Sequence, residues 1–263
     1  CYARPNFEMW TAAQVTKLLV TPQPEDGALR CTGVQVWDGK EMVSVQCTGE
    51  VILSAGSIGT PQILQLSGIG PREVLQQHGI PVVHELSGVG ENLQDHLQIR
   101  SVYKVKSPNG KDISLNTKAK SIWGKTKMAV EYAFKQTGPL SMAPSQLGAF
   151  TRSSPNQQYP NIQYHVQPLS LDAFGEPLHD FPAFTASVCN LNPTSRGHVH
   201  LRSGNFKDAP NIVTNYLSTE YDRQIAVESL RMTRKIVAQS ALAAFQPDEY
   251  KPGSQFQTDE ELV

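Results

Sequence analysis

The sequence lacks an apolar run long enough to cross a membrane, and it lacks an excess of charge of either sign. Its 23 Lys and Arg residues nearly balance 24 Asp and Glu residues, so the formal net charge is −1. With no interleaving of basic and aromatic residues, this balance indicates neither a nucleic-acid partner nor an integral membrane segment. Charged residues form 18% of the 263 residues, against about 25% in an average domain, so we expect further polypeptide to cover part of the surface.

Signatures of several catalytic and metal-binding classes are absent as well. The four cysteines are scattered, without C-x-x-C or other metal-ligand spacing, so we expect free thiols in a reducing, cytoplasmic compartment. His198 and His200 share a face of a predicted strand but have no third ligand at a suitable spacing, so no metal site is expected. The P-loop, G-x-S-x-G and H-E-x-x-H motifs are missing, as is G-x-G-x-x-G, the loop that holds a dinucleotide pyrophosphate.

The stretch from residue 50 to residue 96 organises the chain. Val51–Leu53 is a short apolar run that predicts a strand buried on both faces. Ser54–Gly59 then turns the chain through small residues and is the nearest match to the missing glycine loop. Thr60 as N-cap and Pro61 at the first helical position predict a short helix over Pro61–Leu66. A strand, a small-residue turn and a helix N-terminus together form a place where backbone can approach a nucleotide closely.

Further elements follow from periodicity and capping signals. Alternation predicts three strands joined in part by a hairpin turn at Asp38-Gly39, namely Gln14–Val20, Thr32–Trp37 and Met42–Cys47. Ser218–Ser240 has the clearest helical pattern, capped by Ser218 or Thr219. Between Lys104 and Lys127 lie seven lysines and one aspartate, and we favour a solvated loop there over a binding surface.

Several longer motifs occur in one order along the chain: Gly56–Leu64, Ser67–Pro71, Gly88–Gly90, Asn92–His96 and Pro193–Gly197. This set closely resembles the second signature and later landmarks of the glucose–methanol–choline (GMC) family of flavin oxidoreductases, and in particular its bacterial alcohol and choline dehydrogenases. The resemblance covers essentially the whole chain and implies FAD as the cofactor.

The resemblance implies an α/β (α+β) fold. Residues 1–97 would form part of a Rossmann-like FAD-binding domain, residues 98–245 a substrate domain with a mostly antiparallel sheet flanked by helices, and residues 246–263 a return towards the FAD domain. Family members carry their pyrophosphate loop near the N-terminus and their catalytic histidine near the C-terminus, and neither matches here. We therefore expect an internal fragment with no catalytic base of its own, the base following Val263. Alone it would bind FAD weakly and stay inactive, because its partners are the N- and C-terminal segments of the same enzyme.

The resemblance also implies which residues contact FAD. In the family, the segment that matches Ala13–Val15 lies against the adenine through a valine backbone, so Val15 is a candidate, although it would also fit as an ordinary strand residue. Ser54, Ala55, Gly56 and Ile58, at the turn before the helix, are the other cofactor-binding candidates.

Four residues are candidates for substrate binding: Gln146, His165, Asn190 and Asn192. Aligned on Ser195–Gly197, Asn192 occupies the position of a substrate-binding histidine in choline-oxidising relatives, with Asn190 on the same strand face. The alternative is that both asparagines only satisfy the turn at Pro193. Those relatives carry a glutamate where this chain has Gln146, and the loss of this charge predicts an uncharged alcohol rather than choline. His165 lies on the polar face of an alternating strand.

The expected reaction takes a proton from an alcohol hydroxyl and transfers hydride to FAD, which gives an aldehyde. The small-molecule partner is therefore an alcohol. A non-redox family member that keeps FAD for structure, such as a hydroxynitrile lyase, and a non-catalytic binding module are the alternatives. Asp95 and His96 are adjacent, so their side chains would point to opposite faces, and we expect His96 to be a buried, hydrogen-bonded residue rather than a base.

Overall fold

The computed structural model describes residues 2–25, 27–110, 113–143, 145–173 and 175–263. The chain forms two compact units, Cys1–Gln94 with Arg196–Asn215, and Asp95–Ser195 with Tyr216–Val263. The predicted domains were continuous over 1–97 and 98–245, whereas the chain returns to the first unit between Arg196 and Asn215. Which unit binds which ligand stays a prediction. Cys1, one of the predicted free thiols, lies outside the described residues, whereas Cys31, Cys47 and Cys189 are free.

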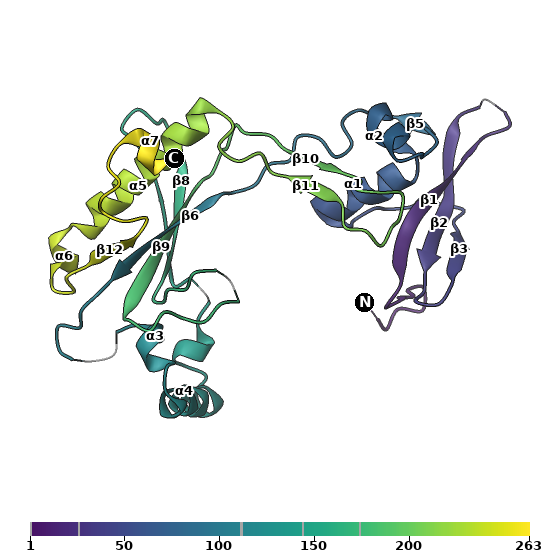
Figure 1. Ribbon diagram of the computed structural model, residues 1–263. Helices are drawn as coiled ribbons and strands as arrows, with labels where there is room; N and C mark the ends of the chain where they lie inside the picture. The colour runs from purple at the N-terminus through teal and green to yellow at the C-terminus, as the bar shows by residue number, and fades with distance from the viewer. Residues whose placement is uncertain (1, 26, 111–112, 144, 174) are drawn as a thin grey trace. The chain divides into compact units, whose positions relative to one another are not determined.

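The first unit combines an antiparallel β1-β2-β3 sheet with helices and two small strand pairs (Figure 1). Its elements are β1 (Gln14–Pro22), β2 (Leu29–Trp37), β3 (Met42–Gln46), α1 (Gly56–Leu66), β4 (Ile69–Gly70), α2 (Arg72–Gln77), β5 (His84–Glu85), β10 (His198–His200) and β11 (Asn211–Val213). The predicted hairpin is confirmed, but its connection is longer than two residues, because Trp37 pairs with Met42. Asp38 closes this connection by accepting the backbone N–H groups of Lys40 and Glu41, each at 2.8 Å.

The predicted buried strand before α1 is wrong. Val51–Leu53 does not pair with any strand of the described residues, and the side chain of Ile52 is 82% exposed. The predicted start of the helix is also wrong, because α1 begins at Gly56 and contains Pro61 within it. Thr60 is not the N-cap; its hydroxyl accepts the backbone N–H of Ala55, at 3.2 Å, from inside the helix.

One buried amide side chain joins three segments of the first unit. Gln65, on α1, is fully buried and donates to the carbonyl oxygens of Val89, at 3.2 Å, and Val199, at 2.9 Å. Its own carbonyl oxygen accepts the backbone N–H of Leu201 at 2.9 Å. A Cβ atom at Gly90 would come within 2.2 Å of the Val199 oxygen and 2.5 Å of the Gln65 amide nitrogen, so only glycine fits there. Gln65 thereby fixes the glycine loop of residues 88–90 and the segment after β10 against α1.

The second unit is built on a five-stranded antiparallel sheet in the order β12-β6-β9-β8-β7. Its elements are β6 (Gln98–Lys104), α3 (Leu115–Lys118), α4 (Ile122–Lys135), the 3₁₀ turn η1 (Pro139–Ser141), β7 (Leu147–Thr151), β8 (Ile162–Gln167), β9 (Ala183–Asn190), α5 (Glu220–Val237), α6 (Ser240–Ala243), β12 (Asp248–Lys251) and α7 (Asp259–Leu262). The predicted mixed α/β fold, with a mostly antiparallel sheet flanked by helices, is confirmed.

Helix α5 covers one face of this sheet. Ile225 packs against the buried side chains of Ile162, Tyr164 and Val188, which belong to neighbouring strands. The Tyr164 hydroxyl bonds to the Thr233 hydroxyl at 2.9 Å, so the polar end of this ring is also satisfied. The predicted helix is confirmed with Thr219 as its N-cap, because the Thr219 hydroxyl accepts the backbone N–H of Asp222.

The lysine-rich segment is not a solvated loop throughout. Residues 115–118 form α3 and residues 122–135 form α4, which is capped by the hydroxyl of Ser121. Among the described residues, no helix is both long enough and apolar enough to cross a membrane.

We expect Gln65→Met to destabilise the first unit by about 2–5 kcal/mol, because two carbonyl oxygens and one N–H group lose their partner inside the protein. Urea unfolding measures the loss, and hydrogen exchange at the Leu201 amide reports it locally. Gln62→Met is the matched control on the same helix, since the partly exposed Gln62 makes one bond, to the Asp208 oxygen at 2.9 Å. Equal losses in the two variants would contradict the proposed role of Gln65.

Candidate functional site

The N-terminus of α1 is open in the first unit. Its N-cap residue, Ala55, makes no side-chain capping bond, and the first turn contains no acidic residue. Ser54, Ala55 and Gly56 are exposed, and Gly56 adopts a positive φ of 75°. Uncapped N–H groups and the helix dipole favour an anion at such an end.

A cavity of about 440 Å³ lies beside this helix. Ser57, Pro61 and Leu64 of α1 line one side of it, and the loop of residues 88–94 lines another. The cavity and the open N-terminus belong to the same unit, but none of the predicted cofactor-binding residues lines the cavity, whereas the carboxylate of Glu91, which pairs with His200, does. Of the four candidates at this turn, Ile58 is the only partly buried one, and the other three are exposed.

Val15 lies on β1, paired with Val36 and followed by a bulge. Its side chain is partly buried. Partial burial fits an ordinary strand residue as well as a residue that contacts the cofactor. The bond that joins β1 to the α1 segment runs from the Leu18 N–H to the Ser67 hydroxyl, at 2.7 Å. Because Ser67 follows the C-terminal end of α1, the structure joins these elements at the end away from residues 54–58. The cofactor contact of Val15 stays a prediction.

In the second unit, the sheet face opposite α5 is polar. Strand pairing places Gly148, His165, Ser187 and Arg100 in one row across β7, β8, β9 and β6. The next row contains Phe150, Gln163, Cys189 and Gln98. Directly paired residues share a face, so these two rows form one surface, which we call the polar face. His165 is partly buried there and its row neighbour Ser187 is buried.

Gln146 lies just before the start of β7. Its backbone N–H donates to the Val166 carbonyl at 3.0 Å, although Val166 is already the partner of Leu147, so the regular pairing and its alternation do not extend to Gln146. Its side-chain amide donates to the sulfur of Met142. Of the four substrate candidates, the strand pairing therefore places His165 on the polar face, and the position of Gln146 on it stays a prediction.

Asn190 and Asn192 are not on that surface. Asn190 pairs with Ile162, so it shares the face that α5 covers, and its amide donates to Asp222 at 3.2 Å. Strand β9 ends at Asn190, so the premise that Asn192 shares its strand face is wrong. Asn192 is exposed, and its backbone N–H donates to the Asn190 side-chain oxygen at 3.1 Å. This geometry supports the turn interpretation, and a substrate contact at either asparagine stays a prediction.

A buried carboxylate organises the turn after these asparagines, and sequence reasoning missed it. Asp222, in the first turn of α5, accepts the backbone N–H groups of Thr194, at 2.9 Å, and Ser195, at 2.8 Å. It is 4% exposed. Burial raises the pKa of Asp222, but hydrogen bonds from Ser195 and Thr194 outweigh this effect and hold the pKa below its ordinary value. The available signal was an acidic residue three positions after a capping threonine.

His96 is exposed, so the prediction that it is buried is wrong. It is hydrogen-bonded as expected, through Nε2 to the Leu191 oxygen at 3.1 Å. The neighbouring Asp95 accepts the hydroxyl of Tyr216 instead of contacting His96. The pair therefore lacks the geometry of a base and its orienting carboxylate. No group of three or more His, Cys, Asp or Glu residues in the described part of the chain could hold a metal ion.

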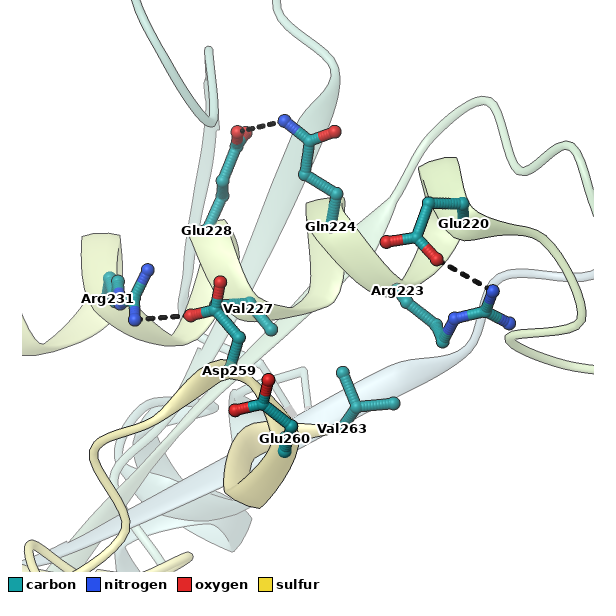
Figure 2. A pocket seen from close by; sticks show the side chains of 9 residues that line it. All are labelled: Glu220, Arg223, Gln224, Val227, Glu228, Arg231, Asp259, Glu260 and Val263. Carbon is teal, nitrogen blue, oxygen red and sulfur yellow. Dashed lines mark hydrogen bonds and ion pairs between the residues drawn. The ribbon is translucent and has the colours of Figure 1, made fainter.

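A second cavity, of about 650 Å³, lies between α5 and α7 (Figure 2). Four of its charged side chains form two ion pairs: Arg223 with Glu220 at 2.8 Å, and Arg231 with Asp259. The Gln224 amide donates to Glu228 at 2.9 Å. None of the predicted site residues lines this cavity, so its size alone does not make it the site.

We expect Asp222→Asn to lower the free energy of unfolding by about 2 kcal/mol or more. The reason is that an amide cannot replace a carboxylate that accepts several hydrogen bonds. Since the folded pKa is lowered, the charge stabilises the protein above the ordinary pKa of about 3.8, and this contribution is lost as pH falls through the folded pKa. The stability difference between wild type and variant should therefore shrink in acid. Denaturant unfolding at neutral and acidic pH measures it.

Glu220→Gln is the control for the previous variant, because Glu220 carries the same charge in the same helical turn but is exposed. We expect it to cost less than about 1 kcal/mol, the size of a helix-dipole effect. A pH-independent difference between wild type and Asp222→Asn would contradict the role of the charge.

Two family models match the chain, both described as GMC oxidoreductase, over residues 1–98 and 193–263. An oxygen-dependent choline dehydrogenase of Pectobacterium carotovorum is 40% identical over 259 residues, which is 98% of this chain and 44% of that protein. An oxygen-dependent choline dehydrogenase of Pseudomonas entomophila is 39% identical over 261 residues, which again is 98% of this chain and 44% of that protein. The chain thus spans less than half the length of these relatives.

Solved structures support the same fold. An FAD-dependent oxidoreductase from Chaetomium thermophilum has a TM-score of 0.80 at 24% identity, covering 99% of this chain and 50% of that one. Pyridoxine 4-oxidase from Mesorbium loti has a TM-score of 0.74 at 23% identity. The match covers 95% of this chain and 43% of the oxidase chain. With both family models and the motif order in agreement, the chain belongs to the GMC oxidoreductase family.

Proposed function

We propose that this chain supplies part of the FAD-binding domain and most of the substrate domain of a flavin-dependent alcohol oxidoreductase. The enzyme transfers hydride from a CH–OH group to FAD and leaves an aldehyde. The observation that carries this proposal is the 40% identity to a choline dehydrogenase over 98% of the chain, which extends through both units.

The open end of α1 supports FAD binding. Ser54, Ala55, Gly56 and Ile58 lie at the start of α1, where the N-cap residue makes no side-chain capping bond and the first helical turn contains no acidic residue. These residues would hold the pyrophosphate, and Val15 would contact the adenine. When bound, FAD supplies the hydride acceptor.

The polar face is the proposed substrate surface. His165 offers a ring nitrogen to an alcohol hydroxyl, and its partly buried position limits the competition from water. Ser187 in the same row adds a hydroxyl, and Gln146 an amide. These groups orient the substrate. We assign none of them the role of the base.

Two observations bear differently on the substrate. The names of the relatives favour choline. However, the two rows that define the polar face, all of whose residues are described, contain no acidic residue and include Arg100, although β12 at the edge of the same sheet pairs Asp248 with Lys104. A quaternary ammonium group therefore lacks a carboxylate there, and we propose an uncharged alcohol as the preferred substrate.

Anaerobic mixing of alcohols with the FAD-loaded enzyme that contains this chain tests the reaction. We expect loss of oxidised-flavin absorbance with an uncharged alcohol, and formation of the aldehyde. The absence of flavin reduction by any alcohol, choline included, would overturn the proposal in favour of a non-redox role.

We expect Gln146→Glu to raise kcat/KM for choline by about tenfold, because one new ionic contact contributes on the order of 1.4 kcal/mol. The value for a neutral alcohol should not rise. Gln157→Glu adds the same charge at a residue between β7 and β8 and is the control. If wild type already prefers choline to neutral alcohols, the proposed substrate preference is wrong.

We expect His165→Ala to lower kcat/KM by about tenfold or more, because one hydrogen bond to the substrate is lost. His165→Asn should recover part of this loss, since it restores a donor. His78→Ala is the control in the first unit. Unchanged kinetics in His165→Ala would remove this residue from the substrate surface.

A further inference from the structure

Gly148 is a glycine in a strand whose own structure does not require one. It lies inside β7 and pairs with His165 of β8, in a register that runs without interruption from Leu147 to Thr151. Its φ is not positive, and a Cβ atom built on it would meet its nearest neighbour, the Tyr164 carbonyl oxygen, at an ordinary 3.7 Å. Among the described residues, neither a bulge, nor an unusual backbone conformation, nor crowding accounts for this glycine.

The other two glycines that lie in strands of the described residues have close neighbours. A Cβ atom at Gly33, in β2, would come within 2.1 Å of the Val45 carbonyl oxygen. A Cβ atom at Gly70, in β4, would come within 3.1 Å of the Gln65 side chain. Glycine costs conformational entropy in a strand and gives it no side chain to pack. A strand glycine without such a neighbour therefore indicates a place where a ligand or another backbone approaches closely.

The position of Gly148 favours a ligand. Directly paired residues share a face, so Gly148 lies on the polar face beside the imidazole of His165. Gly148 is exposed, and because it has no side chain, β7 leaves this flank of the imidazole uncovered. A polypeptide backbone packed here would cover His165, whereas a substrate whose hydroxyl binds His165 needs this space.

An aromatic side chain borders the same space. Phe150 follows Gly148 by two positions, so it lies on the same face, and it pairs with Gln163 in the next row. Its side chain is 61% exposed. Diagonal neighbours in a sheet lie about 7–8 Å apart, so a group held by His165 is within reach of the Phe150 ring. An exposed aromatic ring beside bare backbone offers a packing partner to a flat apolar group.

We propose that Gly148 and Phe150 determine the substrate class, which is an alcohol that carries an aromatic ring. This inference rests on the function proposed for the polar face. The hydroxyl binds His165, the ring of the substrate crosses the backbone at Gly148, and it packs against Phe150. A side chain at position 148 would exclude the ring and leave room for a short aliphatic alcohol. The two rows of the polar face contain no carboxylate, which agrees with a neutral ring.

A comparison of two alcohols tests the proposal in the FAD-loaded enzyme that contains this chain. Wild type should have a kcat/KM for benzyl alcohol at least about tenfold above that for ethanol, because the ring makes contacts that a short chain lacks. Gly148→Val should lower kcat/KM for benzyl alcohol at least about tenfold more than kcat/KM for ethanol. Valine suits a strand better than glycine does, so the urea midpoint of unfolding should not fall.

The chain offers a matched control for each position. A Cβ atom at Gly204, in the first unit, would also meet its nearest neighbour, the His78 oxygen, at 3.7 Å, so Gly204→Val should leave the ratio of the two kcat/KM values unchanged. Phe150→Ala should raise KM for benzyl alcohol by about fivefold or more. Leu147→Ala should leave this KM unchanged, because Leu147 is 66% exposed on the same strand but lies on the other face.

Binding of benzaldehyde, followed through the flavin absorption spectrum, separates this inference from the proposed function. Benzaldehyde should bind wild type at least about tenfold more tightly than Gly148→Val. If no alcohol reduces the flavin but this difference is found, the proposed reaction fails and the aromatic site stands. If alcohols reduce the flavin but Gly148→Val keeps the preference of wild type, the inference fails and the proposed function stands.

Two further results would overturn the inference. One is a wild-type enzyme that oxidises ethanol as efficiently as benzyl alcohol. The other is a Gly148→Val variant that loses FAD or unfolds at a lower urea concentration, which would show that polypeptide backbone, rather than substrate, packs against Gly148.

Discussion

The requirement that buried backbone groups find partners governs both units. Gln65 meets it in the first unit, where one amide satisfies two carbonyl oxygens and one N–H group. Asp222 meets it in the second unit, where one carboxylate accepts the N–H groups of Thr194 and Ser195. In both places a side chain replaces the regular pairing that a sheet would supply. The motif segments Gly88–Gly90 and Pro193–Gly197 are largely irregular, so their shape depends on these two residues.

Local signals predicted the elements that local interactions determine. Thr219 caps α5 as expected, and Thr258 and Glu261 form a capping box at the start of α7. Each of these signals needs only a side chain and the backbone within three residues. The start of α1 was missed because Pro61 was read by its usual place at the first helical position. Here the helix begins at Gly56, before the proline, in a turn where the Thr60 hydroxyl accepts the backbone N–H of Ala55.

For the substrate candidates, prediction succeeded on a regular strand and failed beyond the end of one. Alternation placed His165 on the polar side of its strand, and the pairing of β8 with β7 and β9 agrees with this. It failed for Asn192, because β9 ends two positions earlier and the period of two ends with it. The row of Gly148, His165, Ser187 and Arg100 could not be seen in the sequence at all. Rows depend on the order β6-β9-β8-β7, in which β6 pairs with β9 although β7 and β8 lie between them along the chain.

Charge gives the clearest case of a whole-chain property that hides a local one. A net charge of −1 excludes a general attraction to anionic surfaces, yet it does not describe any one face. The lysines of residues 113–138 are scattered in the sequence and fit a solvated loop equally well. Helix formation changes this, because it brings Trp123, Val130 and Phe134 to one side of the helix, with Lys127 beside them and Lys125 on the far side. Which residues of a lysine-rich segment share a face is therefore a matter of secondary structure, and composition cannot supply it.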